Sequence, residues 1–564
     1  MIFVSAWLAI MGCTTQHYRQ SADQEVHREL QEKTPLVPNM DTNFTIEVTN
    51  RAFLEGLPIS TNVPDFFGEY GIREKGARVL SLEKALEIAV LKSRAYQSRK
   101  EQVYLEGLAL SLSRHQFAPL FSASAGGQYL ATTVNGTEIR VDPITQQPEV
   151  VLSDTLVERD SISGQASVGA SWLIRDLGRI TAAFSTDFFR YLKGDPQALT
   201  RSQTSATFTR PLLRNAGYMA EMENLTQAER SLLYALRDFA RYRKQFSVDV
   251  AAAYYRTLQA RDQARNVSLG YQTFKRNAAQ TRARVREGRI KLAELGRLEQ
   301  QELQQETAWI GAIRGYTLAL DTFKILLGLS TDVNLVLADL ELERLTILHP
   351  SLAVSNAILV ALVGRLDLQN LRNQLEDSKR MVKLAANGLK PQLDLTASAG
   401  LNSKDLPSGF AVPDIQRYHW NAGLELDPAL DRKAQRNAYR TSLIRMEQAR
   451  RAITQSEDEI KLEVREDWRT LEEARRNFEI SEIGVKLSER RVKEQDLLAE
   501  MGRGRAQDQV DAQNDLTNTK NQRTSTLVAH TVARLRFWEH LGILFIKPDG
   551  SWQEIPDVKQ VKTR

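Results

Sequence analysis

The nine residues Leu393-Asp-Leu-Thr-Ala-Ser-Ala-Gly-Leu401 guide the interpretation of the rest of this chain. Apolar side chains occupy every second position, and the positions between them are polar or glycine. A period of two indicates a β-strand with one apolar and one polar face. A second run of the same kind, 419–427, follows shortly afterwards. Each run is close to the ~9–11 residues that a tilted strand needs to cross a bilayer.

These two strands have no obvious sheet to join, because most of the surrounding sequence has a helical pattern. A lone two-stranded hairpin is only marginally stable in water. The strands are therefore either a minor addition to a helical fold, or part of a larger sheet that further copies of the same strands complete.

Composition excludes some classes of function. Of the 564 residues 26% are charged, with mixed sign and a formal net charge of only +5, so composition makes no case for nucleic acid as a partner. No apolar run approaches the ~18 residues that indicate a transmembrane helix.

Cys13 is the only cysteine, which excludes disulfide bonds within the chain and a cysteine-based metal site. It directly follows the apolar run 1–12, which ends in Gly12. This pattern resembles a bacterial lipoprotein signal, whose cysteine becomes the lipidated N-terminus, although Met11 is not the usual small residue and no basic residue precedes the run. Thr14 after the cysteine fits sorting to the outer membrane in that resemblance. The alternative is a buried structural cysteine.

The remaining sequence alternates between helical and β patterns. Residues 13–80 are polar and irregular and are interpreted as a linker, and a helix is expected from Ser81 to about residue 118. A β-rich region follows to about residue 210, with alternating runs at 121–125, 166–172 and 180–184 and a less regular one near 206–208. A very long helix to about Glu287 and a further helix to Gly328 complete this part of the chain.

The pattern then begins again, and this internal repeat is the strongest signal in the sequence. Matching residues recur at constant offsets within each segment: Ala85 with Ala357, Pro119 with Pro391, Gly288-Arg289 with Gly502-Arg503, and Leu327-Gly328 with Leu541-Gly542. The first β region is longer than the second.

The repeat divides the chain into a signal peptide, the linker, two repeats with a spacer between them, and a tail, at 1–12, 13–80, 81–329, 330–350, 351–545 and 546–564. The predicted fold class is mainly α with a β-barrel portion. The repeat indicates a duplicated helix–hairpin–helix unit, and the family resemblance given below implies that this unit builds a long helical coiled-coil barrel and a transmembrane β-barrel closed by trimerisation.

Motifs of catalysis are absent from the sequence, which has no nucleotide-binding, metalloprotease or nucleophile-elbow pattern. The seven His are scattered, so neither a metal site nor a catalytic site is predicted, and no cofactor is expected apart from the lipid at Cys13. An enzyme is therefore not supported.

The order of the motifs, repeated twice over roughly residues 81–545, resembles the TolC-like outer-membrane efflux protein family. The resemblance is carried by Pro391-Gln-Leu before the strand, Arg365-Leu-Asp-Leu368 in the preceding helix, Arg210–Gly217 at a strand-to-helix junction, and Leu541-Gly542. It implies a homotrimer in the outer membrane of a Gram-negative-type bacterium, lipid-anchored, with a helical tunnel across the periplasm. A periplasmic adaptor (membrane fusion) protein and an inner-membrane transporter would be its partners, in efflux or type I secretion. The alternative is a soluble periplasmic scaffold or adaptor.

Closure of a sheet in lipid supports a trimer independently of the resemblance. An open edge would leave backbone groups unpaired, and about eight strands form the smallest common barrel. Two hairpins per chain supply twelve strands in a trimer. The first β region has room for four strands, but we expect two of them in the barrel and the extra hairpin outside it.

In the family, acidic residues beyond the helix turn at the periplasmic tip line a closed entrance, and Asp508 and Asp511 match them here. Spaced three apart, they share a helix face, and threefold symmetry would make two rings of carboxylates that favour cations. In the first repeat only Glu294 corresponds. The alternative is that these are helix-start residues favoured by the helix dipole.

The same tip is basic. The arginines concerned are Arg282, Arg284, Arg286, Arg289, Arg503 and Arg505. They would pair with acidic residues of neighbouring helices, contact an adaptor, or simply remain solvated.

Overall fold

The computed structural model describes residues 14–40, 44–47, 54–61, 64–141, 147–193, 198–288, 291–407, 409–501 and 503–553. Cys13, Arg289 and the predicted signal peptide lie outside these residues. The chain forms two compact units. The helical unit contains residues 1–107, 232–373 and 450–564, and the sheet unit contains residues 108–231 and 374–449.

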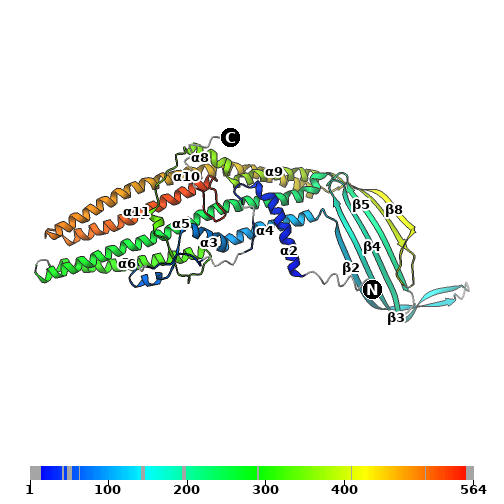
Figure 1. Cartoon of the computed structure of the whole chain (residues 1–564). Helices are drawn as coiled ribbons and strands as arrows, with labels where there is room; N and C mark the ends of the chain where they lie inside the picture. Colours follow the sequence, from blue (N-terminus) through cyan, green and yellow to red (C-terminus); the bar gives the residue numbers. More distant parts are fainter. Residues whose placement is uncertain are drawn as a thin grey trace. The chain divides into compact units, whose positions relative to one another are not determined.

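The helices confirm the predicted duplication. They occur in four matched pairs of almost equal length: α3 (Leu82–Lys92) with α8 (Val354–Gly364), α4 (Arg94–His115) with α9 (Leu366–Asn387), α5 (Tyr218–Arg286) with α10 (Lys433–Glu500), and α6 (Leu292–Leu326) with α11 (Ala506–His540). The α6 and α11 helices have 35 residues each, and α5 and α10 have 69 and 68. In the helical unit, α5, α6, α10 and α11 run alongside one another, and α6 contacts α11 (Figure 1).

The first helix of each repeat is broken where one continuous helix was predicted. Ser93 and Arg365 take extended ψ angles of 124° and 122° and separate α3 from α4 and α8 from α9. At each break, the backbone packs against the turn that ends the last helix of the same repeat. A Cβ added to Gly328 would lie 2.0 Å from the Lys92 carbonyl oxygen, and one on Gly542 would lie 3.1 Å from that of Gly364. The Leu-Gly pairs recognised in the sequence therefore mark close packing of backbone on backbone.

The predicted linker is in part folded, so that expectation was wrong. Helix α2 (Thr15–Lys33) is capped by the Thr14 hydroxyl, and its Val26 and Leu30 are buried. Val26 packs against α4 at Gly107, where a Cβ would meet a Val26 methyl at 2.8 Å. This segment is polar overall, so its few apolar residues, which pack it against the helices, did not indicate a helix in the sequence.

Several short elements lie just before and just after the helices of the first repeat. They are η1 (Thr34–Leu36), η2 (Asp65–Glu74), β1 (Arg78–Leu80), β6 (Leu335–Leu337) and α7 (Leu340–Glu343). Strands β1 and β6 pair in parallel, and all three residues of β6 are buried. The spacer between the repeats is thus tied to the N-terminal segment.

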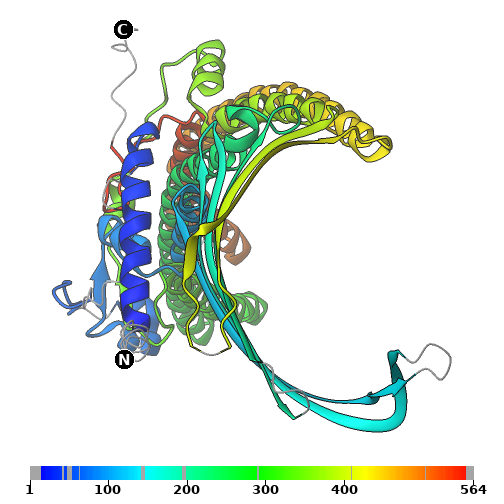
Figure 2. The ribbon, with the colours of Figure 1, turned by 90° about the vertical axis from the view of Figure 1, so that its right-hand side faces the viewer.

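The sheet unit holds six strands in a single antiparallel sheet. They are β2 (Leu120–Val141), β3 (Pro148–Ile174), β4 (Gly178–Lys193), β5 (Ala198–Pro211), β7 (Gln392–Ser403) and β8 (Pro413–Asp427), in spatial order β2-β3-β4-β5-β7-β8. Strand β5 of the first repeat pairs with β7 of the second. The expectation that one hairpin of the first β region lies outside the sheet was wrong, because all four of its strands share the hydrogen-bond ladder. Figure 2 shows that the sheet is strongly curved.

Among the described residues, no helix is both long enough and apolar enough to span a membrane.

We predict that Gly328→Ala lowers the stability of the protein by about 3 kcal/mol or more, because alanine would have to adopt φ +78° and would clash with backbone. Gly296→Ala is the matched control: nothing lies within 4 Å of its added Cβ, and alanine favours the interior of α6 by roughly 0.5–1 kcal/mol. Thermal unfolding followed by circular dichroism measures both. Equal midpoints for the two variants would contradict the packing described at Ser93.

Candidate functional site

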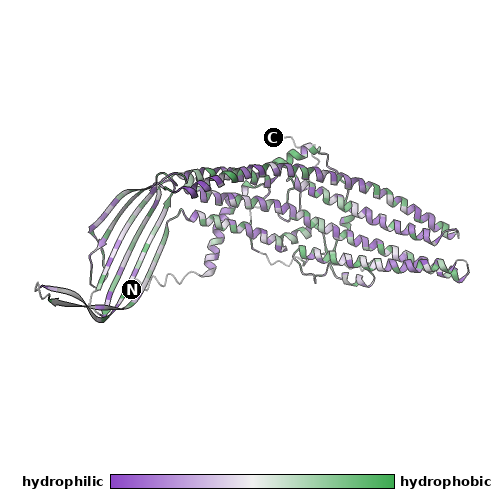
Figure 3. Ribbon diagram, turned by 180° about the vertical axis from the view of Figure 1, so that it is seen from behind, coloured by the Kyte–Doolittle hydropathy of each residue, from purple (hydrophilic) through white to green (hydrophobic). Residues whose placement is uncertain are grey.

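The six-stranded sheet has one apolar and one polar face. The pairing register places residues of the same face opposite each other on neighbouring strands, so both faces extend across the whole sheet. One row of directly paired residues is Phe121, Ala170, Ala182, Ala206, Ala399 and Trp420. The adjacent row, which points to the other face, is Ser122, Gly169, Ala183, Ser205, Gly400 and His419. Figure 3 shows the corresponding alternation of hydrophobic and hydrophilic residues along the strands. The alternation seen in Leu393–Leu401 is therefore a property of the whole sheet.

Large apolar side chains of this sheet are exposed. Phe121 is 82% and Trp420 is 72% accessible, and Leu424 and Leu426 on the same face of β8 are also exposed. Soluble monomeric proteins rarely leave an apolar face of this kind open to water. Lipid or another protein must therefore cover it. The opposite face, rich in Ser, Thr and Gly, suits contact with water.

The two acidic residues predicted to form a constriction lie at the start of α11, in the helical unit. Asp508 is in the first turn, and Asp511 accepts a hydrogen bond from Gln507 Nε2 at 2.9 Å. Both side chains are partly exposed. Val510, between them, belongs to a buried cluster with residues of α5 and α6, which fixes the rotation of this end of the helix.

Glu294 stands in α6 where Asp508 stands in α11, as the third residue of a helix of 35 residues. Its Oε2 atom is buried and has no hydrogen-bond partner among the described residues. The sixth residue of each helix is Arg297 in α6 and Asp511 in α11. The first repeat thus lacks the second carboxylate of the pair.

The basic residues of the tip differ in their contacts. Arg282 Nη2 lies 2.6 Å from Glu299 Oε1 on the next helix, so it pairs within its own hairpin. Arg284 Nη1 donates to the backbone oxygen of Ala499 at the end of α10, at 3.1 Å. The other arginines of the tip that the structure describes have exposed side chains. They are Arg286, Arg503 and Arg505.

The Arg365-Leu-Asp-Leu motif lies at the break between α8 and α9 and forms a partly buried charge network. Arg365 Nη2 lies 2.8 Å from Asp367 Oδ2, and its Nη1 contacts Glu463 on α10. Glu463 in turn contacts α11, since its Oε1 atom lies 3.4 Å from His540 Nε2, and His540 Nδ1 lies 2.6 Å from Asp467 Oδ2 on α10. The motif therefore connects three segments of the helical unit, which is a structural role.

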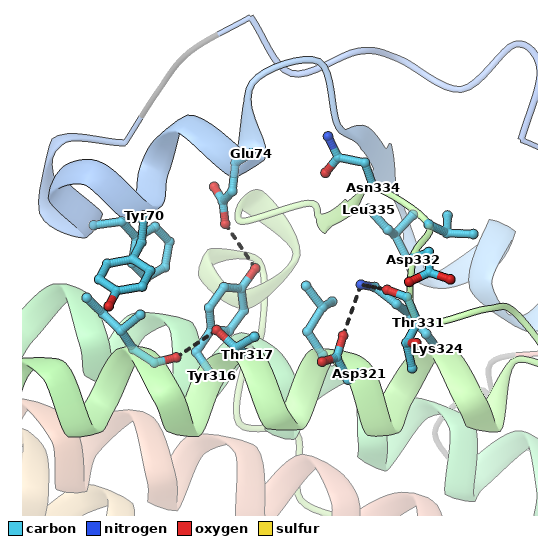
Figure 4. A pocket seen from close by; sticks show the side chains of 14 residues that line it. Tyr70, Glu74, Tyr316, Thr317, Asp321, Lys324, Thr331, Asp332, Asn334 and Leu335 are labelled. Carbon is cyan, nitrogen blue, oxygen red and sulfur yellow. Dashed lines mark hydrogen bonds and ion pairs between the residues drawn. The ribbon is translucent and has the colours of Figure 1, made fainter.

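A cavity of about 430 Å³ in the helical unit is lined by η2, α6 and the segment Thr331–Leu335 (Figure 4). Tyr316 Oη donates to Glu74 Oε1 at 3.1 Å, and Lys324 Nζ lies 3.1 Å from Asp321 Oδ1. These polar groups satisfy one another. Nowhere in the described part of the chain do three His, Cys, Asp or Glu residues come together in a way that could hold a metal ion.

His530 on α11 is a feature that the sequence did not single out. Its side chain is fully buried, and neither ring nitrogen has a hydrogen-bond partner among the described residues. Burial lowers the pKa of His530 to about 4, and the neighbouring Arg534, His349 and Arg475 act in the same direction. The ring is therefore neutral in the folded protein at neutral pH.

No model of a known protein family matches the sequence, and no curated protein is significantly similar to it. Solved structures do match. The outer-membrane channel OprN is 12% identical, with 90% of this chain and 98% of that one covered at a TM-score of 0.59. The CmeC outer membrane channel of Campylobacter jejuni is 13% identical, with coverage of 90% and 93% and a TM-score of 0.56. The open state of the Neisseria gonorrhoeae MtrE outer membrane channel is 14% identical, with coverage of 82% and 89% and a TM-score of 0.58.

At these identities the similarity establishes the fold. The chain has the TolC-like fold of outer-membrane efflux channels, in agreement with the resemblance seen in the sequence.

We predict that acid destabilises the helical unit through His530. Its folded-state pKa lies below the ordinary value of ~6.5, so its contribution to stability is present above that value and is lost as pH falls toward about 4. Between pH 7 and pH 5 the loss amounts to about 2 kcal/mol per chain. His530→Leu should reduce the difference between unfolding midpoints at the two pH values. An unchanged difference would show that this histidine does not control the acid response.

Proposed function

We propose that this protein is the outer-membrane channel of a tripartite efflux or type I secretion system, through which substrates pass to the exterior without catalysis. The observation that carries the proposal is the curved antiparallel sheet with an exposed apolar face and a polar opposite face. In a bilayer the apolar face contacts lipid and the polar face lines a water-filled lumen. In a soluble periplasmic scaffold the same apolar face would remain in water, which disfavours that alternative.

The edges of the sheet support the assembly of the chain into a homotrimer. Within the part of the chain that the structure describes, strands β2 and β8 each have a partner strand on only one side. In lipid these edges must be paired, and six strands are fewer than the smallest common barrel. Pairing of β8 with β2 of the next copy closes the sheet, and three copies give eighteen strands instead of the twelve expected from two hairpins per chain. Barrels of sixteen to eighteen strands leave an aqueous channel.

The helical unit supplies the periplasmic part of the duct in this proposal. The tip formed by the α5–α6 and α10–α11 turns would receive a periplasmic adaptor protein and, through it, an inner-membrane transporter. Lipidation of Cys13 would anchor the N-terminus in the outer membrane. The transported substrate is selected by the transporter, since the described residues show no specific substrate site.

The assignment of the two faces is tested by placing the same residue on each. We predict that Ala399→Arg abolishes membrane-inserted trimer, because an arginine on the lipid face costs roughly 2–4 kcal/mol in each of three chains. Ser398→Arg, on the adjacent position of the same strand, should insert normally and lower cation selectivity. Membrane fractionation and heat-modifiable migration of the trimer measure insertion. If both variants inserted equally well, the apolar face would not contact lipid.

The constriction is tested at Asp508 and Asp511. Replacing both by Ala should lower cation selectivity and change the conductance in planar bilayers, because a ring of carboxylates attracts cations. Asp458→Ala removes an exposed carboxylate from the middle of α10 and serves as the control. Unchanged values for the double variant would leave these residues with the role of helix-start residues.

A further inference from the structure

The ends of the sheet are distinguished by their connections. The β2–β3, β4–β5 and β7–β8 connections lie at one end, and the junctions with α4, α5, α9 and α10 lie at the other. In the proposed channel the helices are periplasmic. The end with the three hairpin connections therefore faces the exterior of the cell.

One hairpin extends far beyond the others at this outer end. Residues Thr132–Val141 of β2 pair only with Pro148–Arg159 of β3 among the described residues. The pairing of β3 with β4 begins at Asp160. We call these two segments the arm. Nine steps of about 3.3 Å along Thr132–Val141 make it roughly 30 Å long.

The base of the arm is held in place. Lys193 at the end of β4 lies 3.0 Å from Glu158 Oε2 and 3.9 Å from Asp160 Oδ2. Tyr129 forms a side-chain hydrogen bond with Asp160, and Asp160 and Ser161 are buried. The register shifts between Asn135 and Thr137. Figure 2 shows the arm bending toward the concave side of the sheet.

An arm of this kind needs a partner, because a lone two-stranded hairpin is marginal in water. An eighteen-stranded barrel with strands ~4.8 Å apart and tilted by ~40° has a backbone radius of roughly 18 Å. The arm, at roughly 30 Å, is longer than this radius. Arms that bend inward from three copies therefore overlap near the axis of the barrel.

We propose that the arm is an interaction surface for the arm of a second copy, and that the three arms together narrow the extracellular mouth of the channel. This inference rests on the proposed function. A twelve-stranded barrel would be narrower, whereas the wider barrel formed by six strands per chain needs such a restriction to limit entry from outside.

The inference is tested by removing the arm. Residues 135–156 are deleted, and Val134 is joined to Val157, its direct partner, through an Asn-Gly turn. Neutral polyethylene glycols of graded size are then added to each side of a planar bilayer that contains the channel. The largest polymer that enters from the extracellular side should increase at least twofold in mass, and the value from the helical side should not change.

Cross-linking provides a second measurement that does not depend on the folding of the deletion variant. Gln147→Cys, at the end of the arm, should form disulfide-linked dimers in intact cells. Lys404→Cys, at the outer end of β7, is the matched control, and it should form few. Both variants retain Cys13, so its contribution cancels.

The outcomes separate the two proposals. If the wild type forms channels but the polymer limit is unchanged and Gln147→Cys does not cross-link, the arms do not meet and only the inference about the arm fails. If the wild type forms no channel, both proposals fail. Cross-linking with an unchanged limit would show that the arms meet without narrowing the mouth, which also overturns the inference.

Discussion

The structure depends on one constraint: the outer strands of the sheet, β2 and β8, carry backbone N–H and C=O groups on their free edges that pair with no other strand among the described residues. In water such an edge is a risk of aggregation, and in lipid each unpaired group costs several kcal/mol. The exposed apolar face adds a second requirement of the same kind. A surface that contacts lipid and edges that pair with other copies satisfy both requirements together. Both requirements support the proposal that the sheet is one part of a larger closed assembly.

In the helical unit, the corresponding constraint is that long helices must be joined without leaving gaps between them. The breaks at Ser93 and Arg365 make room for the Leu-Gly turns that end α6 and α11, and the backbone of each turn packs directly on the break. The same solution appears twice because the repeat is duplicated. The charge network at Arg365 then ties the second break to α10 and α11. The short elements around the spacer add a small parallel sheet, β1 with β6.

The two repeats differ in the residues at the tip and in the number of strands. At the tip, α11 presents Asp508 and Asp511, whereas α6 has Glu294 and Arg297 at the same positions. In the β region the first repeat contributes four strands and the second contributes two. Strand β2 follows α4 as β7 follows α9, and β5 precedes α5 as β8 precedes α10, so the additional strands are β3 and β4. The arm is formed by β3 together with β2. The two repeats therefore contribute unequally to the single sheet.

The sequence by itself determined the features that repeat at short range. The alternation in Leu393–Leu401 identified a two-faced strand, and matching residues identified the duplication, because side-chain periodicity reports local geometry directly. It also placed Asp508 and Asp511 near a helix start. Only the tertiary structure decided that all four strands of the first β region share one sheet with β7 and that residues 15–33 form a helix bound to α4. It also decided that His530 is buried with no hydrogen-bond partner among the described residues. These outcomes depend on contacts between residues far apart in the chain, which no local pattern records.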